Sequence, residues 1–189
     1  MVKLYISTII SLFLMLLFTS EARGQGFVAV DDIPHDISYY RESKITPPLA
    51  KVLYGRPQKN DEEVFGNLVP YNKLWRTGAN EATEVKFYKD VEFGNCKVKA
   101  GTYVLVTIPG ENDWLVILNS QTDVWGSFQY NPIFNVAEIA VPVKKGEPLK
   151  DFTITFKEKN DATKMILGWD TVRVNVPIKF EKEPVIVSN

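Results

Sequence analysis

Hydrophobic and polar residues alternate one by one along much of the chain from Leu49 onward. The alternation is clearest at residues 152–157 and 172–180, where valine, isoleucine and phenylalanine occupy every second position. Successive side chains of a β-strand point to opposite faces of its sheet, so this period of two predicts strands with one buried and one solvated face. Such strands are typical of antiparallel sheets.

Two segments depart from this alternation because they are almost entirely apolar on both faces. They cover residues 103–108 and 114–118, and the turn-like sequence Pro-Gly-Glu-Asn at 109–112 separates them. Two apolar runs joined by a short turn predict a β-hairpin. Because neither face is polar, we expect the hairpin to lie centrally in the sheet, with the N-terminal arm covering one of its faces.

The segment that precedes the alternating region, residues 23–48, is broken by prolines and aspartates. Only residues 37–40 resemble a strand. The pair at 47–48, Pro-Pro, excludes a central strand there because proline cannot donate a ladder hydrogen bond. We interpret this segment as an N-terminal arm that packs along the domain.

The only helical signal is a short turn near residues 61–65, for which Asn60 or Asp61 would be the cap. What remains is roughly eight to ten short strands separated by turns, which predict an all-β protein. We expect a single antiparallel β-sandwich, or a flattened barrel, with an N-terminal arm. The predicted boundaries are a signal peptide at 1–22, the arm at 23–48, the β-sandwich domain at 49–181 and a C-terminal tail at 182–189.

The N-terminus has the pattern of a secretory signal peptide. Lys3 supplies a positive charge, and residues 4–18 form an apolar stretch of about fifteen residues, shorter than the roughly 20 that span a bilayer. Residues 20–22, Ser-Glu-Ala, fit the small-x-small cleavage pattern. We therefore expect a periplasmic or extracellular protein without a membrane span after cleavage. A retained membrane anchor is the alternative.

The amino-acid composition argues against some classes of binding partner. Lysine and arginine number 22 and aspartate and glutamate 23, which gives a net charge of −1. This balance argues against nucleic acid and against a polybasic membrane-binding surface. The single cysteine, Cys96, cannot form an intramolecular disulfide, so the hydrophobic core must stabilise the domain. We interpret Cys96 as a buried or half-buried packing residue, and we expect no cofactor.

One stretch, residues 68–83, breaks the period of two and concentrates groups that bind ligands. It places Trp75, Arg76, Asn80 and Glu81 around a glycine. The chain contains five arginines against seventeen lysines, so arginine is used sparingly. Its planar guanidinium is suited to bidentate contact with carboxylate or phosphate.

Two further motifs complete the predicted site. Arg56 lies in Tyr-Gly-Arg-Pro, just upstream, and Trp125 lies in an aromatic-rich motif at 124–132. Two interpretations stay open for the arginines: Arg56 or Arg76 pairs with Glu81 inside the protein, or they bind a ligand. The aromatic motif either stacks on sugars or seals one end of the sandwich. The predicted ligand-binding residues are Arg56, Trp75, Arg76, Asn80, Glu81 and Trp125.

The only histidine offers little for catalysis. His35 lies among Asp31, Asp32 and Asp36, and one histidine with three carboxylates could hold a metal. A solvated acidic loop is the favoured interpretation for so proline-rich a segment. A catalytic triad would need His35 as its base, and no Gly-x-Ser-x-Gly motif accompanies it. We therefore predict no catalytic residue and no metal ligand.

Five motifs are distributed over the alternating region, and the most specific is Trp-Arg-Thr-Gly-Ala-Asn-Glu-Ala-Thr at 75–83. The others are Tyr-Gly-Arg-Pro at 54–57, Phe-Gly-Asn-Leu-Val-Pro-Tyr at 65–71, Ala-Gly-Thr-Tyr at 100–103 and Trp-Gly at 125–126. Together they resemble the bacterial exported family catalogued as domain of unknown function 2911, from about Leu49 to Phe180. The resemblance implies export and these domain bounds. It implies no catalytic residues, because the family carries no established activity.

These observations predict an exported binding or cell-envelope accessory module that recognises a small anionic or sugar-bearing ligand. Its partner would be a small molecule or an envelope component. Two alternatives belong to other functional classes. One is a carbohydrate-active hydrolase that uses Glu81, and the other is a protein–protein interaction module that binds through a sheet edge or through the arm.

The cleavage pattern gives the first testable prediction. If residues 1–22 are a signal peptide, the exported protein begins near Arg23 and stays in solution without detergent. N-terminal sequencing of the periplasmic or secreted form checks this, and a protein that retained Met1 would contradict it.

Overall fold

The computed structural model describes Gly26, residues 31–159 and residues 162–180. The chain divides into two units, 1–31 and 32–189, and every element described below belongs to the second. Of the first unit, only Gly26 and Asp31 are described. The predicted signal peptide and the predicted C-terminal tail lie outside the described residues.

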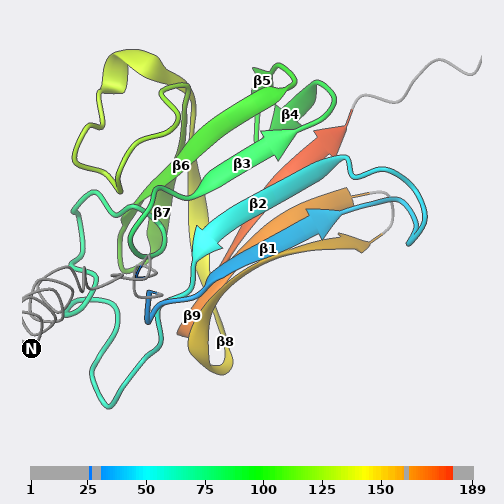
Figure 1. Cartoon of the computed structure of the whole chain (residues 1–189). Coiled ribbons are helices and arrows are strands. Elements are labelled where there is room, and N and C mark those ends of the chain that lie inside the picture. The colour runs from blue at the N-terminus through cyan, green and yellow to red at the C-terminus, as the bar shows by residue number, and fades with distance from the viewer. Residues whose placement is uncertain (1–25, 27–30, 160–161, 181–189) are drawn as a thin grey trace, which may run out of the picture. The chain divides into compact units, whose positions relative to one another are not determined.

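Alternating side chains produce strands throughout the described part of the second unit, together with one short 3₁₀-helix (Figure 1). The elements in chain order are β1 (His35–Tyr40), β2 (Ala50–Gly55), β3 (Glu84–Phe87), β4 (Val91–Phe93), β5 (Cys96–Val98), β6 (Gly101–Pro109), β7 (Asp113–Asn119), η1 (Pro132–Phe134), β8 (Asn135–Lys159) and β9 (Ala162–Phe180).

All neighbouring strands pair antiparallel, in the order β1-β2-β3-β6-β7-β8-β9-β4-β5. The long strand β8 pairs with β7 over residues 135–142 and with β9 over residues 143–159, so it passes from one layer to the other. Figure 1 shows the two layers, with β1, β2, β3 and β6 in one and β9 in the other. The predicted antiparallel β-sandwich is confirmed, and the sheet does not close into a barrel.

The two long strands exchange their buried and exposed faces where they bend. In β8 the buried residues are odd-numbered over 137–141 and even-numbered at 152 and 154, and the pairing with β9 shifts on either side of Leu149. In β9 the buried positions change from odd at Trp169 to even at Val172. A β-bulge inserts an extra residue and so moves all later side chains to the opposite face. The bulges therefore let both strands keep side chains in the core on either side of the bend, and in β8 they do so where the strand changes layer.

Arg173 ties this bend together. Its Nη1 donates hydrogen bonds to the carbonyl oxygens of Asp170 at 2.8 Å and Val172 at 2.7 Å, and its Nη2 donates to the carbonyl of Glu147. Burial lowers the pKa of Arg173, while the negative charges of Asp170 and Glu147 oppose that effect. The guanidinium thus supplies hydrogen-bond donors where bulged strands leave carbonyl groups without ladder partners.

A cluster of aromatic rings fills the core at one end of the sandwich. Trp75 lies 5.0 Å from Phe152 and 5.9 Å from Trp114, measured between ring centroids, and Phe65 lies 5.0 Å from Trp114. Most of these pairs meet edge to face, the arrangement that the quadrupoles of aromatic rings favour. The cluster joins the irregular segment 56–83 to both layers.

The predicted hairpin is confirmed as β6 and β7, which pair from Val104 with Asn119 to Pro109 with Trp114. The prediction that the N-terminal arm covers one of its faces was wrong for the described residues. The arm contributes β1, which pairs with β2 at the far edge of the sheet. The outer face of the hairpin packs instead against side chains from two irregular loops: Leu74, Ala82, Val124 and Tyr130.

The short helix expected near residues 61–65 is also absent. These residues form turns, in which the Val69 amide donates to the Val64 carbonyl at 2.8 Å and the Gly66 amide to the Val69 carbonyl at 2.9 Å. Val64 and Phe65 are buried in the core, and burying two consecutive side chains fits an irregular turn better than one helical face. Within the described residues, no helix is long and apolar enough to cross a membrane.

The aromatic core gives a stability prediction with an internal control. Trp114 is 2% exposed, so truncation to alanine should cost about 3–5 kcal/mol of unfolding free energy, the usual range for a buried large aromatic. Trp125 is 53% exposed, so Trp125→Ala should change stability by no more than about 0.5 kcal/mol. Denaturant melts of both variants measure the difference. Equal losses of unfolding free energy in the two variants would show that Trp125 also packs in the core.

Candidate functional site

The irregular stretch around Arg76 starts from a fixed point in the core. The Trp75 amide donates to the Thr107 carbonyl at 2.7 Å, and the Thr107 amide donates back to the Trp75 carbonyl at 3.0 Å. The Trp75 ring belongs to the aromatic cluster, 5.0 Å from Phe152. The structure therefore places Trp75 under the predicted ligand site, where it anchors the loop, rather than on its surface.

Thr77 holds the next turn in a strained conformation. Its φ of 58° lies in the left-handed region, which is unusual for a β-branched residue, and it is fully buried. The Thr77 hydroxyl lies 3.0 Å from the Thr107 hydroxyl, and the Thr83 hydroxyl donates to the Thr77 carbonyl at 2.8 Å. Strain of this kind, of the order of 1–3 kcal/mol, persists only where the surroundings determine the conformation. The loop 76–83 is therefore rigid.

The loop is also pressed against the end of β2. A Cβ atom on Gly55 would lie 2.0 Å from the Ala79 carbonyl oxygen, closer than any real contact, so only glycine fits there. Asn80, with φ of 60°, adds a second left-handed residue to the turn. Backbone contact on one side and buried threonines on the other fix the direction in which Arg76, Asn80 and Glu81 leave the loop.

A second loop, 120–134 between β7 and β8, lies beside the first. The Ala82 amide donates to the Val124 carbonyl at 3.3 Å. Gly126 has φ of 59°, and a Cβ atom on it would lie 3.2 Å from Cδ of Arg76 and 3.3 Å from the Asn80 carbonyl oxygen. Two motifs that were singled out separately in the sequence, around Arg76 and around Trp125, therefore meet in space.

Arg76 is not neutralised by any carboxylate of the described residues. Its side chain is half-buried, and its Nε is buried without a hydrogen-bond partner. Among the described residues no carboxylate forms an ion pair with Arg76, and Glu81 is exposed on the same loop. The interpretation in which Arg76 pairs with Glu81 inside the protein does not match this geometry. The buried Nε leaves one donor of this guanidinium unsatisfied, although the residue as a whole is only half-buried.

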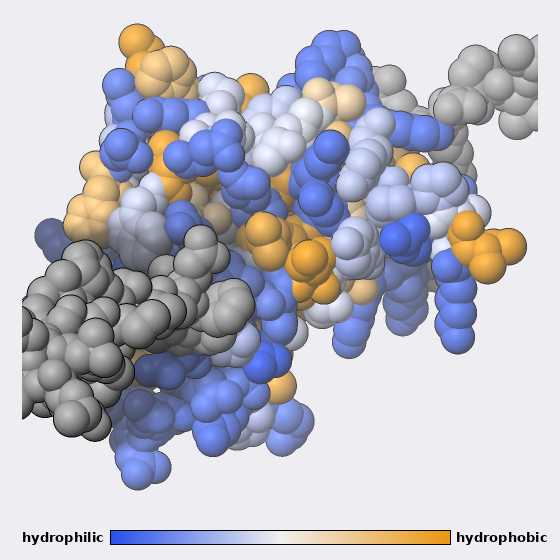
Figure 2. Space-filling model, in the orientation of Figure 1, coloured by the Kyte–Doolittle hydropathy of each residue, from blue (hydrophilic) through white to orange (hydrophobic). Residues whose placement is uncertain are grey.

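The neighbouring loop exposes large apolar side chains. Trp125 is 53% exposed and Phe128 is 83% exposed, and Ile133, Phe134 and Val136 follow at the surface. In Figure 2, hydrophobic side chains gather at the upper left, over the loop that Figure 1 draws between β7 and β8. Contiguous exposed apolar side chains on a soluble domain mark interaction sites. The motif at 124–132 thus has both roles: Val124 and Tyr130 cover the outer face of the hairpin, while Trp125 and Phe128 are exposed.

Arg56 serves a different contact. Its Nη1 lies 3.2 Å from Oδ2 of Asp36 in β1, and its backbone amide donates to the Pro34 carbonyl at 2.9 Å. Both side chains are about one third exposed. Burial raises the pKa of neighbouring Tyr54, and Asp36 adds to that rise. Arg56 therefore ties the edge strand β1 to the end of β2, and its partner is Asp36 rather than Glu81.

The remaining sequence candidates, His35 and Cys96, show no catalytic or metal-binding arrangement among the described residues. His35 is exposed at the start of β1, and its neighbour Asp36 is engaged with Arg56. Within the described ranges, no group of three or more histidine, cysteine, aspartate or glutamate side chains is arranged to hold a metal. Cys96 is a free thiol in β5, partly buried.

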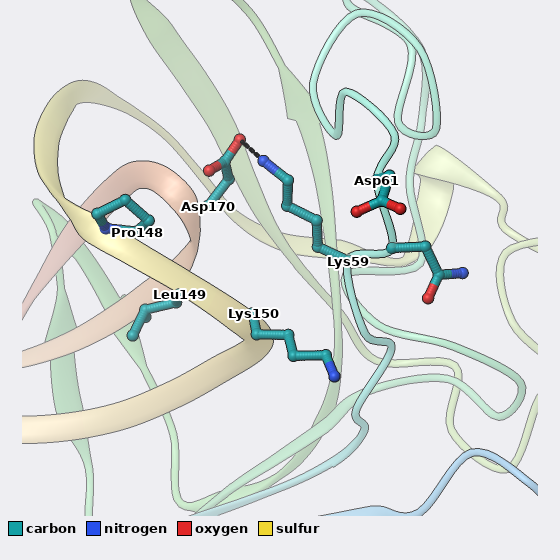
Figure 3. A pocket seen from close by; sticks show the side chains of 7 residues that line it. Lys59, Asp61, Pro148, Leu149, Lys150 and Asp170 are labelled. Atoms are coloured by element: carbon teal, nitrogen blue, oxygen red, sulfur yellow. Dashed lines mark hydrogen bonds and ion pairs between the residues drawn. The ribbon is translucent and has the colours of Figure 1, made fainter.

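A separate hollow of about 530 Å³ lies at the bend of β8 and β9, and Lys59, Asp61, Lys150 and Asp170 are among its lining residues (Figure 3). Nζ of Lys59 lies 2.8 Å from Oδ2 of Asp170, whose φ of 46° is left-handed. Figure 3 shows Lys59 extended toward Asp170, with Lys150 directed away from the pair. One carboxylate is therefore neutralised by an ammonium group, unlike the facing carboxyl pair that glycoside hydrolysis uses.

Sequence reasoning missed this hollow, although one signal was present. Buried residues change from odd to even positions between Trp169 and Val172, and this break in period marks the bulge at Asp170. The partner, Lys59, is far away in the sequence. Nothing in the local pattern around Lys59 points to Asp170.

The family model described as protein of unknown function, DUF2911, matches residues 41–178. The chain belongs to this family. The match confirms the resemblance that the five motifs suggested. It includes the loops 76–83 and 120–134. No curated protein and no solved structure matches the chain significantly.

The separation of Arg76 from Glu81 can be measured with a double-mutant cycle. Arg76→Met keeps the aliphatic stem that packs on Gly126, so each of Arg76→Met and Glu81→Gln should change stability by under about 1 kcal/mol. Because the two charges are not paired, their coupling energy should be under about 0.5 kcal/mol. Denaturant melts of the four proteins give the value.

Arg56 and Asp36 provide the matched control, because they do form a pair. The same cycle with Arg56→Met and Asp36→Asn should give a coupling of about 0.2–1 kcal/mol, as for a partly exposed ion pair. A coupling above about 1.5 kcal/mol between Arg76 and Glu81 would mean that the loop uses Arg76 structurally.

Proposed function

We propose that this protein is an exported binding module that recognises a carboxylate-bearing sugar on the surface formed by loops 76–83 and 120–134. One observation carries the proposal. The guanidinium group of Arg76, which pairs with no carboxylate among the described residues, extends from a strained, buried turn beside the loop of the exposed Trp125.

The chemistry of these side chains fits such a ligand. The terminal nitrogens of Arg76 present two parallel N–H donors, which match the two oxygens of a carboxylate. The flat, half-exposed ring of Trp125 offers an apolar face on which a pyranose ring can stack. The exposed carboxylate of Glu81 can accept hydrogen bonds from sugar hydroxyls. Arg76 on loop 76–83 would thus bind the carboxylate of the ligand, and Trp125 on loop 120–134 would bind its sugar ring.

Rigidity supports binding as the role of this surface. Thr77, Thr83 and Thr107 hold the Arg76 loop through buried hydroxyl contacts, so little conformational freedom remains to be lost when a ligand arrives. Binding costs fall when the recognising groups are already in place. The surface is open, which leaves room for the ligand to continue as a polymer, as an envelope glycan would.

The hydrolase alternative has less support. Glu81 is exposed on its loop, whereas the general acid of a glycosidase needs a sheltered site that raises its pKa. In the bend hollow, the carboxylate of Asp170 is already paired with Lys59. Neither carboxylate is in surroundings that favour acid–base catalysis, so binding without chemistry is the better assignment.

The proposal is tested by titrating the isotope-labelled protein with glucuronate and, separately, with glucose. We expect glucuronate to shift the indole signal of Trp125 and the amides of residues 76–83, and glucose to bind at least about tenfold more weakly because it lacks the carboxylate. Arg76→Lys should weaken glucuronate binding by about tenfold or more, since lysine cannot present the planar fork.

Arg41 gives a matched control. Its guanidinium lies 4.9 Å from the centre of the half-exposed Tyr39 ring, so it is another arginine beside an exposed aromatic residue. Arg41→Lys makes the same chemical change on a different part of the surface and should alter affinity less than about twofold. Equal effects of the two substitutions, or shifts that map away from both loops, would overturn the proposal.

A further inference from the structure

The outer face of the β8–β9 ribbon contains a hollow of about 430 Å³ whose charge is of one sign. Lys144, Lys145, Lys157 and Arg173 line it. In the part of the chain that the structure describes, no carboxylate side chain lines this hollow. The chain as a whole has a net charge of −1, so the concentration of four cations here is a local feature.

The strand pattern explains why these cations share one surface. In β8, residues 153, 155 and 157 alternate with the buried residues Phe152 and Ile154, so they face outward. Lys144 lies directly opposite Arg173 in the β8–β9 register, and Lys157 lies directly opposite Lys164. Like charges directly opposite each other on neighbouring strands are destabilising. This face of the ribbon contains two such pairs.

The charge of Arg173 cannot move away from the hollow. Its guanidinium is fixed by hydrogen bonds to the carbonyl groups of Asp170, Val172 and Glu147. These are backbone acceptors, which leave the positive charge in place. The negative charges of Asp170 and Glu147 act on Arg173 from outside the lining of this hollow, and Asp170 is itself paired with Lys59. Arg173 therefore provides a fixed positive charge, and the longer, more mobile lysine side chains around it can adjust to a bound anion.

We propose that this hollow binds a ligand with two or more closely spaced phosphate groups. Four cations in a hollow of this size match the charge of several phosphates better than that of a single carboxylate. Thr153, Thr155 and Asn175 also line the hollow and supply neutral hydrogen-bond donors for phosphate oxygens. This hollow contains no residue of loops 76–83 and 120–134. The phosphate proposal can therefore be tested independently of the proposed sugar site.

The test titrates the isotope-labelled protein with tripolyphosphate at low ionic strength and compares inorganic phosphate at the same concentration. We expect tripolyphosphate to shift the amides of Thr153, Thr155 and Asn175, and to bind at least about tenfold more tightly than inorganic phosphate, since several charges act together. Binding should weaken strongly as salt is raised, because the site is open to solvent.

The variant is the double substitution Lys144→Gln with Lys145→Gln, which should weaken tripolyphosphate binding by about tenfold or more. Lys51 and Lys86 provide the control: they are also directly opposite each other, but on β2 and β3, away from this hollow. Lys51→Gln with Lys86→Gln removes the same charge and should change the affinity less than about twofold.

Lys157→Gln, checked by a thermal melt, is the second variant if the double change near the bend impairs folding. It should weaken binding without moving the melting temperature, because Lys157 is exposed. Equal losses from the two double variants would overturn the proposal, since net charge alone would then explain them. Absence of tripolyphosphate binding at low salt would overturn it as well.

Discussion

Arg173 holds the bend of the β8–β9 ribbon, at which β8 leaves one layer of the sandwich and enters the other. A strand that crosses between layers must turn a new set of side chains toward the core, and a shift of one residue does this for every later position. The bulges around Leu149 and at Asp170 supply that shift. They also interrupt the hydrogen-bond ladder, and the guanidinium of Arg173 reaches carbonyl groups on both strands. One side chain thereby stabilises the step that makes the sheet a two-layer structure.

The same bend shapes the surface. Leu149 lines both the hollow that contains the Lys59–Asp170 pair and the hollow that contains the cluster of cations. Opposite charges are paired in the first, and like charges are left facing one another in the second. A fold that needs a bulge at this point gains two concave surfaces beside it, and their different charge comes from the choice of side chains at exposed positions. Apart from Arg173, which holds the bend, the outward positions that line the second hollow make no contact among the described residues on which the bend depends.

The period of two was enough to predict strands, the antiparallel sheet and the β6–β7 hairpin, because these depend on which residues are buried. It could not show that the run at 152–156 belongs to a strand that crosses between layers, or that the run at 165–180 contains a bulge. The site was predicted less well, for reasons that differ between residues. Trp75 looks the same in sequence whether its ring faces a ligand or the core, and only the tertiary contacts with Phe152 and Trp114 decide. Arg56 finds its partner in the N-terminal arm, a long-range pairing that no local pattern contains. Arg76 was found because arginine is scarce in this chain and stands in its least periodic stretch.

The Arg76 loop contains two unfavourable features that a purely structural role does not explain. Thr77 adopts a left-handed conformation, and Nε of Arg76 is buried without a hydrogen-bond partner. An unsatisfied buried donor costs about 1–3 kcal/mol. If the side chain served only to pack on Gly126, a lysine would supply the same aliphatic stem and keep its ammonium group in water. What arginine adds is a planar guanidinium with several N–H donors, which a lysine does not have. Among the described residues no carboxylate pairs with this guanidinium, and it lies beside the loop of the exposed Trp125. Both features support the proposed site, in which the partner of Arg76 comes from outside the domain.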